Sequence, residues 1–260
     1  MNLYKRDYKE ILTIDEREAV KEENEFRTKK LGLTSKSPLC SHPDGQIKKF
    51  LNHHFSLFPN NYLYKRDLYK LNLEQEAKKF LGKLNSAKNE TEIQNYIKNN
   101  EKWFIPASLF KDYNFGHHDA YLFPEIALGE KYRADYMLLG KNSDGYSIVF
   151  IEFEDVNVDY ILKTTVAESV NVRKGLTQVK DWKRWMDDNR EYFLRSVKIS
   201  DYGIKIPTSR IYYCLVVSRR EKMTLEAREL RSQEIYDNSN LKIVSYDRLV
   251  DNITDLGMGY

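Results

Sequence analysis

The chain has 260 residues, of which 41% are hydrophobic and 31% are charged, so its apolar content suffices for a packed core. No apolar run approaches the roughly 18 residues of a membrane-spanning helix, and the start does not resemble a signal peptide, so we expect no membrane partner and a cytoplasmic location. A net charge of +3 neither requires nor excludes nucleic acid as a partner.

Residues 1–88 predict a mostly helical region. Thr13 and Glu16 have capping-box spacing before a charged helix expected from Asp15 to Leu31, and residues 33–45, rich in Ser, Pro and Gly, predict a loop or linker. Asn72 with Gln75 then opens a helix that runs through Leu84. We expect this region to be regulatory, sensory or involved in oligomerisation.

Residues 89–260 predict a second, α/β domain. Asn89 with Glu92 opens a helix that ends near Asn100, and the segment from Pro106 through Gly116 breaks the pattern. Glu125, beside Pro124 and just before the hairpin, is interpreted as a loop residue. Beyond it the pattern predicts a hairpin within 132–154, a helix over 168–193, a strand from Arg210, a helix over 225–235 and a strand from Leu241. This alternation favours a mixed sheet flanked by helices.

The hairpin from Tyr132 to Glu154 carries acids at selected positions. If its turn is centred on Ser143 and Asp144, Met137 faces Phe150 and Asp135 faces Glu152. Because side chains alternate between the two faces of a strand, Glu154 projects beside Glu152, whereas Phe153 points into a core on the other face. Like charges this close destabilise a sheet unless a cation lies between them, which predicts a metal site.

Magnesium suits such a site because it prefers oxygen ligands and retains several waters, and Mn²⁺ is a possible substitute. We expect Asp135, Glu152 and the backbone carbonyl of Phe153 to hold the ion. Glu154 could bind the same ion, bind a second ion or accept a proton from an attacking water. Glu125 is a further candidate ligand, although an acid beside a proline in a loop is more often a surface residue.

The helix predicted over 168–193 adds polar groups to this site. Gln178 shares a helical face with Lys174, so an amide and an ammonium group could approach the acids together. The amide could orient a water or touch a phosphate. Lys174 and Arg173 either form a solvated basic face or contact DNA phosphates.

Four segments in this order resemble the nuclease domain of Shedu antiphage defence proteins, within the PD-(D/E)XK nuclease superfamily: PEIALGEKYRADYMLLG, IVFIEFEDVN, GLTQVKDWKRWM and IVSYDRLV. The resemblance spans residues 89–253. It implies a restriction-endonuclease-like fold and a metal-dependent DNA endonuclease that acts in antiviral defence, usually as a homo-oligomer. It also implies that Asp135 and Glu152 bind the metal and that Gln178 is the site glutamine.

Two positions depart from the superfamily pattern. Ala134 replaces a common proline, which has no chemical role, and Glu154 stands where lysine is common. A lysine at this position would stabilise the transition state at phosphorus with its positive charge. The glutamate instead adds a negative charge, which needs a further cation. Two metal ions, or Lys174 or Lys163 as a substitute cation, would supply it.

Other functions stay open. A nuclease fold that no longer cuts would bind or regulate nucleic acid, and cleavage of RNA is not excluded. The His117-His118-Asp119 segment and the pair Cys40 and His42 lack the ligand spacing of structural zinc sites.

Overall fold

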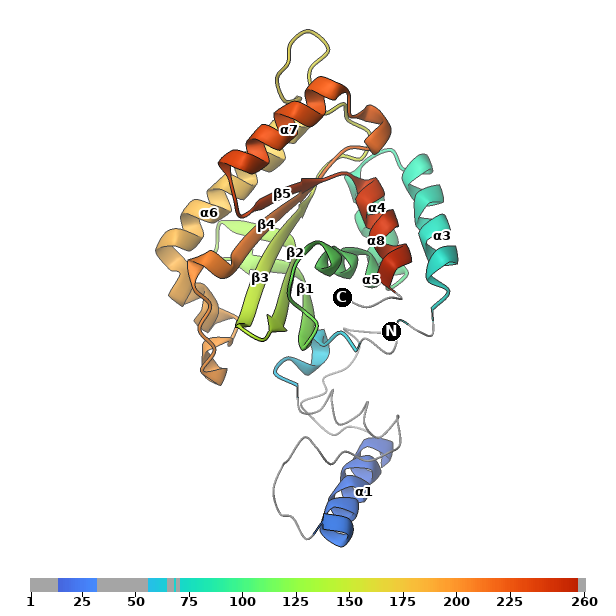
Figure 1. Ribbon diagram of the computed structural model, residues 1–260, viewed down its shortest axis with the longest axis vertical. Coiled ribbons are helices and arrows are strands. Elements are labelled where there is room, and N and C mark those ends of the chain that lie inside the picture. Colours follow the sequence, from blue (N-terminus) through green and yellow to red (C-terminus); the bar gives the residue numbers. More distant parts are fainter. Residues whose placement is uncertain (1–13, 32–55, 65–67, 69–70, 257–260) are drawn as a thin grey trace. The chain divides into compact units, whose positions relative to one another are not determined.

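The computed structural model describes residues 14–31, 56–64, 68 and 71–256 (Figure 1). The chain divides into two compact units, Asn2–Tyr64 and Lys65–Tyr260. The first unit contains helix α1 (Ile14–Leu31), which confirms the predicted charged helix, and the 3-10 helix η1 (Pro59–Asn61). Thr13 and the predicted loop at 33–45 lie outside the described residues.

The second unit begins with helices α3 (Leu73–Ser86) and α4 (Glu90–Asn99), which start at the predicted caps. Oδ1 of Asn72 accepts a hydrogen bond from Gln75 N at 3.0 Å, and Oδ1 of Asn89 accepts one from Glu92 N at 3.1 Å. The short helix α5 (Phe104–Ala107) and the 3-10 helix η3 (Ser108–Asp112) follow.

A five-stranded mixed sheet forms the centre of this unit, in the order β1-β2-β3-β4-β5. Strands β1 to β3 are antiparallel, and β3 to β5 are parallel. The strands are β1 (Asp119–Leu128), β2 (Tyr132–Asn142), β3 (Gly145–Phe153), β4 (Ile211–Val216) and β5 (Leu241–Val244). The helices of this part are α6 (Val170–Ser196), α7 (Leu225–Asp237) and α8 (Tyr246–Asp255), with 3-10 turns η4 (Ser200–Tyr202), η5 (Thr208–Arg210) and η6 (Arg220–Lys222). The predicted α/β fold with a mixed sheet flanked by helices and a helical region before it is confirmed.

Strand β1 corrects the interpretation of the segment around Glu125 as a loop. Pro124 cannot donate a backbone hydrogen bond, and this made the segment resemble a connection. A proline is tolerated here because β1 is an edge strand of the sheet.

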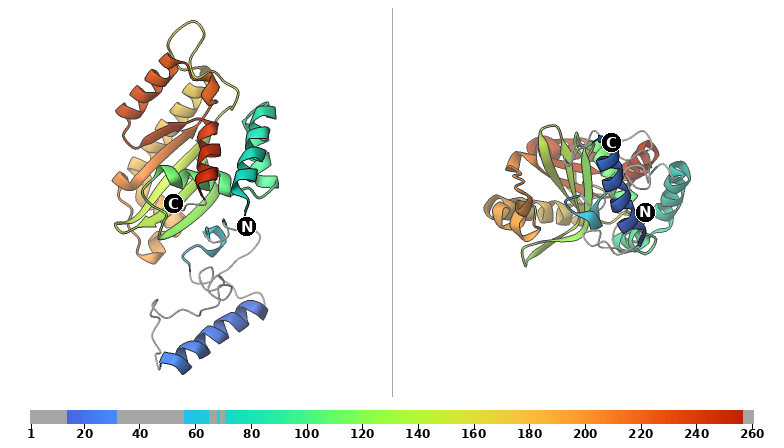
Figure 2. Two further views of the ribbon diagram at one scale, coloured as in Figure 1. Left: turned by 45° about the vertical axis from the view of Figure 1, so that its right-hand side comes forward. Right: turned by 90° about the horizontal axis from the view of Figure 1, so that it is seen from below.

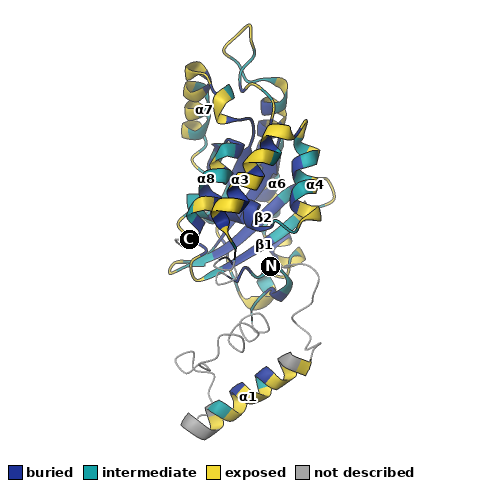
Figure 3. Cartoon of the chain, turned by 90° about the vertical axis from the view of Figure 1, so that its right-hand side faces the viewer, coloured by how far each residue is buried: buried dark blue, intermediate teal, exposed yellow. Residues whose placement is uncertain are grey.

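Helices cover both faces of the sheet. Helices α6 and α7 lie along one face, and α3, α4, α5 and α8 lie on the other (Figures 1 and 2). The strands between them are largely buried (Figure 3). None of the described helices is long and apolar enough to cross a membrane.

Strand β3 presents alternate residues to the two layers of helices. The ring of Phe150 packs on Phe193 of α6 at a centroid distance of 5.3 Å, whereas Phe153 packs on Tyr246 of α8 at 5.5 Å. The predicted hairpin register is also confirmed, since Met137 pairs with Phe150. The residues of β3 at every second position from Phe150 therefore face α6 as well.

The predicted domain boundary between residues 88 and 89 stays a prediction. The compact unit that holds the sheet begins at Lys65, and α3 packs against α8 within it. The proposed role of residues 1–88 is likewise a prediction.

Candidate functional site

Asp135 lies where the pairing of β2 with β3 ends. The last paired residues are Tyr136 and Ile151, one position before Asp135. Its Oδ2 accepts a hydrogen bond from Phe153 N at 2.7 Å, so a side chain continues the backbone ladder. Burial raises the pKa of Asp135, against the opposing effect of this bond, and repulsion from Glu154 raises it further.

Glu152 is buried on the face of β3 that α6 covers, with 6% of its surface exposed. Its Oε2 has no hydrogen-bond partner within the part of the chain that the structure describes. Burial, followed by repulsion from Asp135 and Glu154, raises the pKa of this carboxyl group well above its ordinary value. An ionised Glu152 is therefore costly without a cation beside it.

Glu154 follows the end of β3, and both its backbone N–H and its backbone carbonyl form hydrogen bonds. Its N donates to Val216 O at 2.8 Å, and its carbonyl accepts from the Tyr246 hydroxyl at 2.6 Å. The buried carboxylate forms an ion pair with Lys174 of α6, with 2.9 Å between Oε1 and Nζ. The side chain that departs from the superfamily pattern is thus already paired with a cation.

Glu90, the first residue of α4, is a fourth acid near this site that the sequence interpretation missed. Burial, and then repulsion from Asp135 and Glu154, raises its pKa to about 7. Gln94, one helical turn later, accepts a 2.6 Å hydrogen bond from the Tyr136 hydroxyl, which links α4 to the strand that carries Asp135. The helix cap at Asn89 predicts that Glu90 lies in the first turn of a helix. No feature of the local sequence predicts that this helix packs beside β2.

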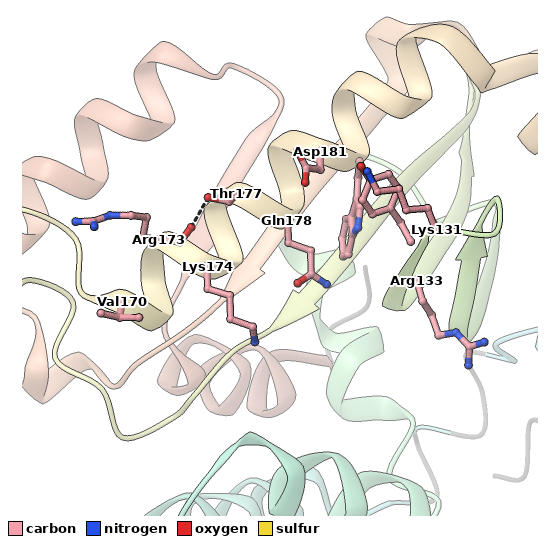
Figure 4. A pocket seen from close by; sticks show the side chains of 10 residues that line it. Lys131, Arg133, Val170, Arg173, Lys174, Thr177, Gln178 and Asp181 are labelled. Atoms are coloured by element: carbon pink, nitrogen blue, oxygen red, sulfur yellow. Dashed lines mark hydrogen bonds between the residues drawn. The ribbon is translucent and has the colours of Figure 1, made fainter.

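A pocket of about 640 Å³ opens between the β1–β2 turn and α6 (Figure 4). Lys174 and Gln178 project from the same side of α6, and Lys131 and Arg133 lie across from them. The lining residues are Lys131, Tyr132, Arg133, Val170, Arg173, Lys174, Thr177, Gln178, Asp181 and Trp182. We call this pocket the basic groove, because four of its lining residues are Lys or Arg.

Two of the remaining candidates, Glu125 and Lys163, do not line the basic groove. The exposed carboxylate of Glu125 pairs with Lys98 at 3.1 Å and with Arg133 at 3.9 Å. Lys163 is exposed between β3 and α6 and does not line the groove. Arg173 does line it, and its guanidinium donates to Glu168 O at 3.1 Å.

The acids suit a divalent cation only if other oxygens complete its coordination. Across the described ranges, no group of three or more His, Cys, Asp or Glu residues forms a ready-made metal site. Magnesium commonly uses one or two carboxylates and keeps several waters. The buried Oε2 of Glu152, which no described residue hydrogen-bonds, fits this requirement beside Asp135.

The fold is of the α/β class, a mixed sheet flanked by helices, with the acids Asp135 and Glu152 near the point where two adjacent strands end. The chain belongs to the Shedu family, because the family model described as "Shedu protein SduA, C-terminal" matches residues 87–250. This confirms the predicted family. Family membership together with the fold supports a function of the nuclease type.

The chain is also similar to a solved structure described as restriction endonuclease FokI bound to DNA. The identity is 11%, the TM-score is 0.36, and the match covers 73% of this chain and 31% of that one. The chain therefore spans about a third of that protein's length. No curated protein matches the chain.

Proposed function

We propose that this protein is a magnesium-dependent endonuclease that hydrolyses DNA phosphodiester bonds in antiviral defence. The observation that carries the proposal is the buried carboxylate oxygen of Glu152 that has no hydrogen-bond partner among the described residues; burial, and then repulsion from Asp135 and Glu154, raises the pKa of this carboxyl group. A carboxylate kept there at a cost in stability suits a metal ligand better than a structural residue.

Asp135, Glu152 and the carbonyl of Phe153 would hold the ion in this proposal. When bound, Mg²⁺ polarises a phosphate oxygen and lowers the pKa of bound water. The hydrogen bond from Phe153 N fixes the orientation of the Asp135 carboxylate before any ion arrives.

The reaction consumes one water. Its oxygen forms a bond to phosphorus while the bond to one ester oxygen breaks, the water passes a proton to a carboxylate or to solvent, and the departing oxygen gains a proton. Glu154 and Glu90 are candidate proton acceptors. The pKa of Glu90 is about 7, so this group can take up and release a proton at neutral pH. Gln178, whose side chain lines the basic groove, would orient the water or the phosphate.

Phosphate contacts by Lys174, Arg173 and Lys163 belong to the same proposal. Lys174 and Arg173 line the basic groove, and Lys163 is exposed on the segment that precedes α6. Assembly into a homo-oligomer and a cytoplasmic location stay predictions.

Cleavage of supercoiled plasmid in Mg²⁺ tests the activity. Glu152→Gln keeps the size of the side chain and removes its charge, so we expect cleavage to fall at least about 100-fold while DNA binding persists. Equal cleavage by wild type and Glu152→Gln would reject the proposal. Cells that express either form and are challenged with phage test the role in defence, and protection should require Glu152.

A second function is a protein of the same fold that binds nucleic acid without cutting it. The observation that favours it is Glu154, a negative charge where the superfamily commonly has lysine. DNA binding with neither Mg²⁺ affinity nor cleavage in the wild type would support this function over the first.

A further inference from the structure

We propose that Lys174 is the cationic catalytic residue of this site, supplied by helix α6 instead of strand β3. Its ammonium group would contact the phosphate under attack, and Glu154 would hold it beside the acids. This inference rests on the proposed nuclease function and names the residue that offsets the charge developing on the phosphate.

The two ends of the Lys174–Glu154 pair differ in exposure. The Glu154 side chain is 3% exposed, whereas that of Lys174 is 63% exposed, and Nζ lies 2.9 Å from Oε1. The ammonium group therefore lies between a buried acid and the open basic groove that Lys174 lines. A cation in this position can reach a ligand in the groove without leaving the acids.

The fold brings this part of α6 unusually close to the ends of β3 and β4. A Cβ atom on Gly175 would lie 2.6 Å from Cδ1 of Leu215 and 2.8 Å from Cγ of Glu154. Any larger residue would force the helix or these side chains apart. The glycine next to Lys174 thus sets the short distance across which Lys174 meets Glu154.

Lys174 also acts on the other acids. Its positive charge partly offsets the rise in pKa of Glu90, Asp135 and Glu152. The electrostatic influence of one helix residue therefore extends over the whole acid group. A positive charge so placed stabilises added negative charge on a phosphate, as a lysine at position 154 on the strand would.

Moving the charge from helix to strand tests the proposal. Lys174→Gln should lower the cleavage rate constant about 100-fold or more. Glu154→Lys combined with Lys174→Gln returns one cation from the strand side and should recover at least about tenfold of that loss. Glu154→Gln with Lys174→Gln removes both charges without replacing the cation and should stay as inactive as Lys174→Gln.

Lys180 offers a matched control on the same helix. Its Nζ pairs with Glu234 at 2.6 Å, and it does not line the basic groove, so Lys180→Gln should cleave as wild type does. Lys174→Arg keeps the charge and should retain more activity than Lys174→Gln. Thermal unfolding of every variant identifies those that fail to fold, and the remaining ones decide the outcome.

A readout without metal separates a phosphate contact from a structural role. In EDTA, the slope of log affinity for DNA against log salt should become less negative by about 0.9 in Lys174→Gln, as for one lost phosphate contact. The proposal is overturned if Lys174→Gln cleaves within about threefold of wild type, or if the doubly neutral variant matches the charge-transposed one. A wild type that cuts no DNA would instead reject the proposed function, and this inference with it.

Discussion

The side chain of Asp135 replaces a backbone carbonyl in the hydrogen bonding between β2 and β3. Its Oδ2 accepts a 2.7 Å hydrogen bond from Phe153 N just beyond the last paired residues of the two strands. The bond fixes the orientation of an acid in a place that burial makes unfavourable for its charge. The sheet thereby stabilises a group that the proposed metal requires in one orientation.

Two substitutions at Asp135 separate its charge from its hydrogen bond. Asn can still accept from Phe153 N, so Asp135→Asn should lose divalent-ion binding while the metal-free protein unfolds at or above the wild-type temperature. Asp135→Ala loses the acceptor as well, which should lower the free energy of unfolding by about 1–3 kcal/mol relative to Asp135→Asn. Calorimetric titration with Mn²⁺ and thermal unfolding measure the two effects, and wild-type ion affinity in Asp135→Asn would contradict the metal assignment.

Two helical glycines should respond to alanine in opposite ways. In α6, the added methyl of Gly175→Ala would meet Leu215 and Glu154 at under 3 Å, so we expect a loss of about 1–3 kcal/mol of stability. In α3, no atom of the described part of the chain lies within 4 Å of a Cβ added at Gly82, and Gly82→Ala should gain up to about 1 kcal/mol. Urea unfolding measures both, and equal effects would show that the close approach of α6 is unimportant.

The hairpin and its acids could be predicted from the sequence because their geometry is local. A strand alternates faces every residue and a short turn fixes the pairing, so the positions of Met137 and Phe150 follow from counting. The same counting placed Asp135 near Glu152 but could not anticipate that its side chain would turn to the backbone of Phe153.

Features that depend on distant contacts were not predictable in this way. The position of Glu90 depends on how α4 packs, including the bond from the Tyr136 hydroxyl to Gln94, 42 residues away in the chain. Strand β1 was hidden by Pro124, whose effect depends on whether a strand lies at an edge of the sheet. The sequence offered Lys174 and Lys163 as alternative cations for Glu154, and the packing of α6 against the strand ends pairs Lys174 with it.

Glu90 should make the metal-free protein less stable as the pH rises. Its pKa is about 7 in the folded protein against an ordinary value of 4.5, so the folded state binds the proton more tightly between these values. Stability is therefore lost as the pH rises through about 7, by on the order of 1 kcal/mol after allowance for partial exposure. Glu90→Gln should remove this loss. Denaturant unfolding in EDTA at pH 5 and pH 8 compares the two proteins, and an identical pH dependence would contradict the prediction.

Divalent-ion affinity should increase with pH. Burial, together with repulsion among the acids, raises the pKa of Asp135 to about 6 and raises the pKa of Glu152 well above its ordinary value, so protons compete with an incoming ion more strongly at pH 6 than at pH 8. We expect tighter Mn²⁺ binding at pH 8 than at pH 6, with proton release that calorimetry detects as a dependence of the binding heat on the buffer. Binding without proton release would mean that these carboxyl groups are not the ligands.

Lys131 and Arg133 should contribute to DNA affinity without affecting the metal. They face Lys174 and Gln178 across the basic groove. Arg133 pairs with the exposed Glu125 at 3.9 Å, which is not one of the ligands Asp135, Glu152 and the Phe153 carbonyl of the proposed function. Replacing both with Ala should weaken DNA binding in EDTA and make the salt slope less negative by about 2, at unchanged Mn²⁺ affinity. Lys78 in α3 and Arg228 in α7 are exposed and lie outside the groove, so their double Ala variant is the matched control. Equal salt slopes for the two double variants would place the DNA on another surface.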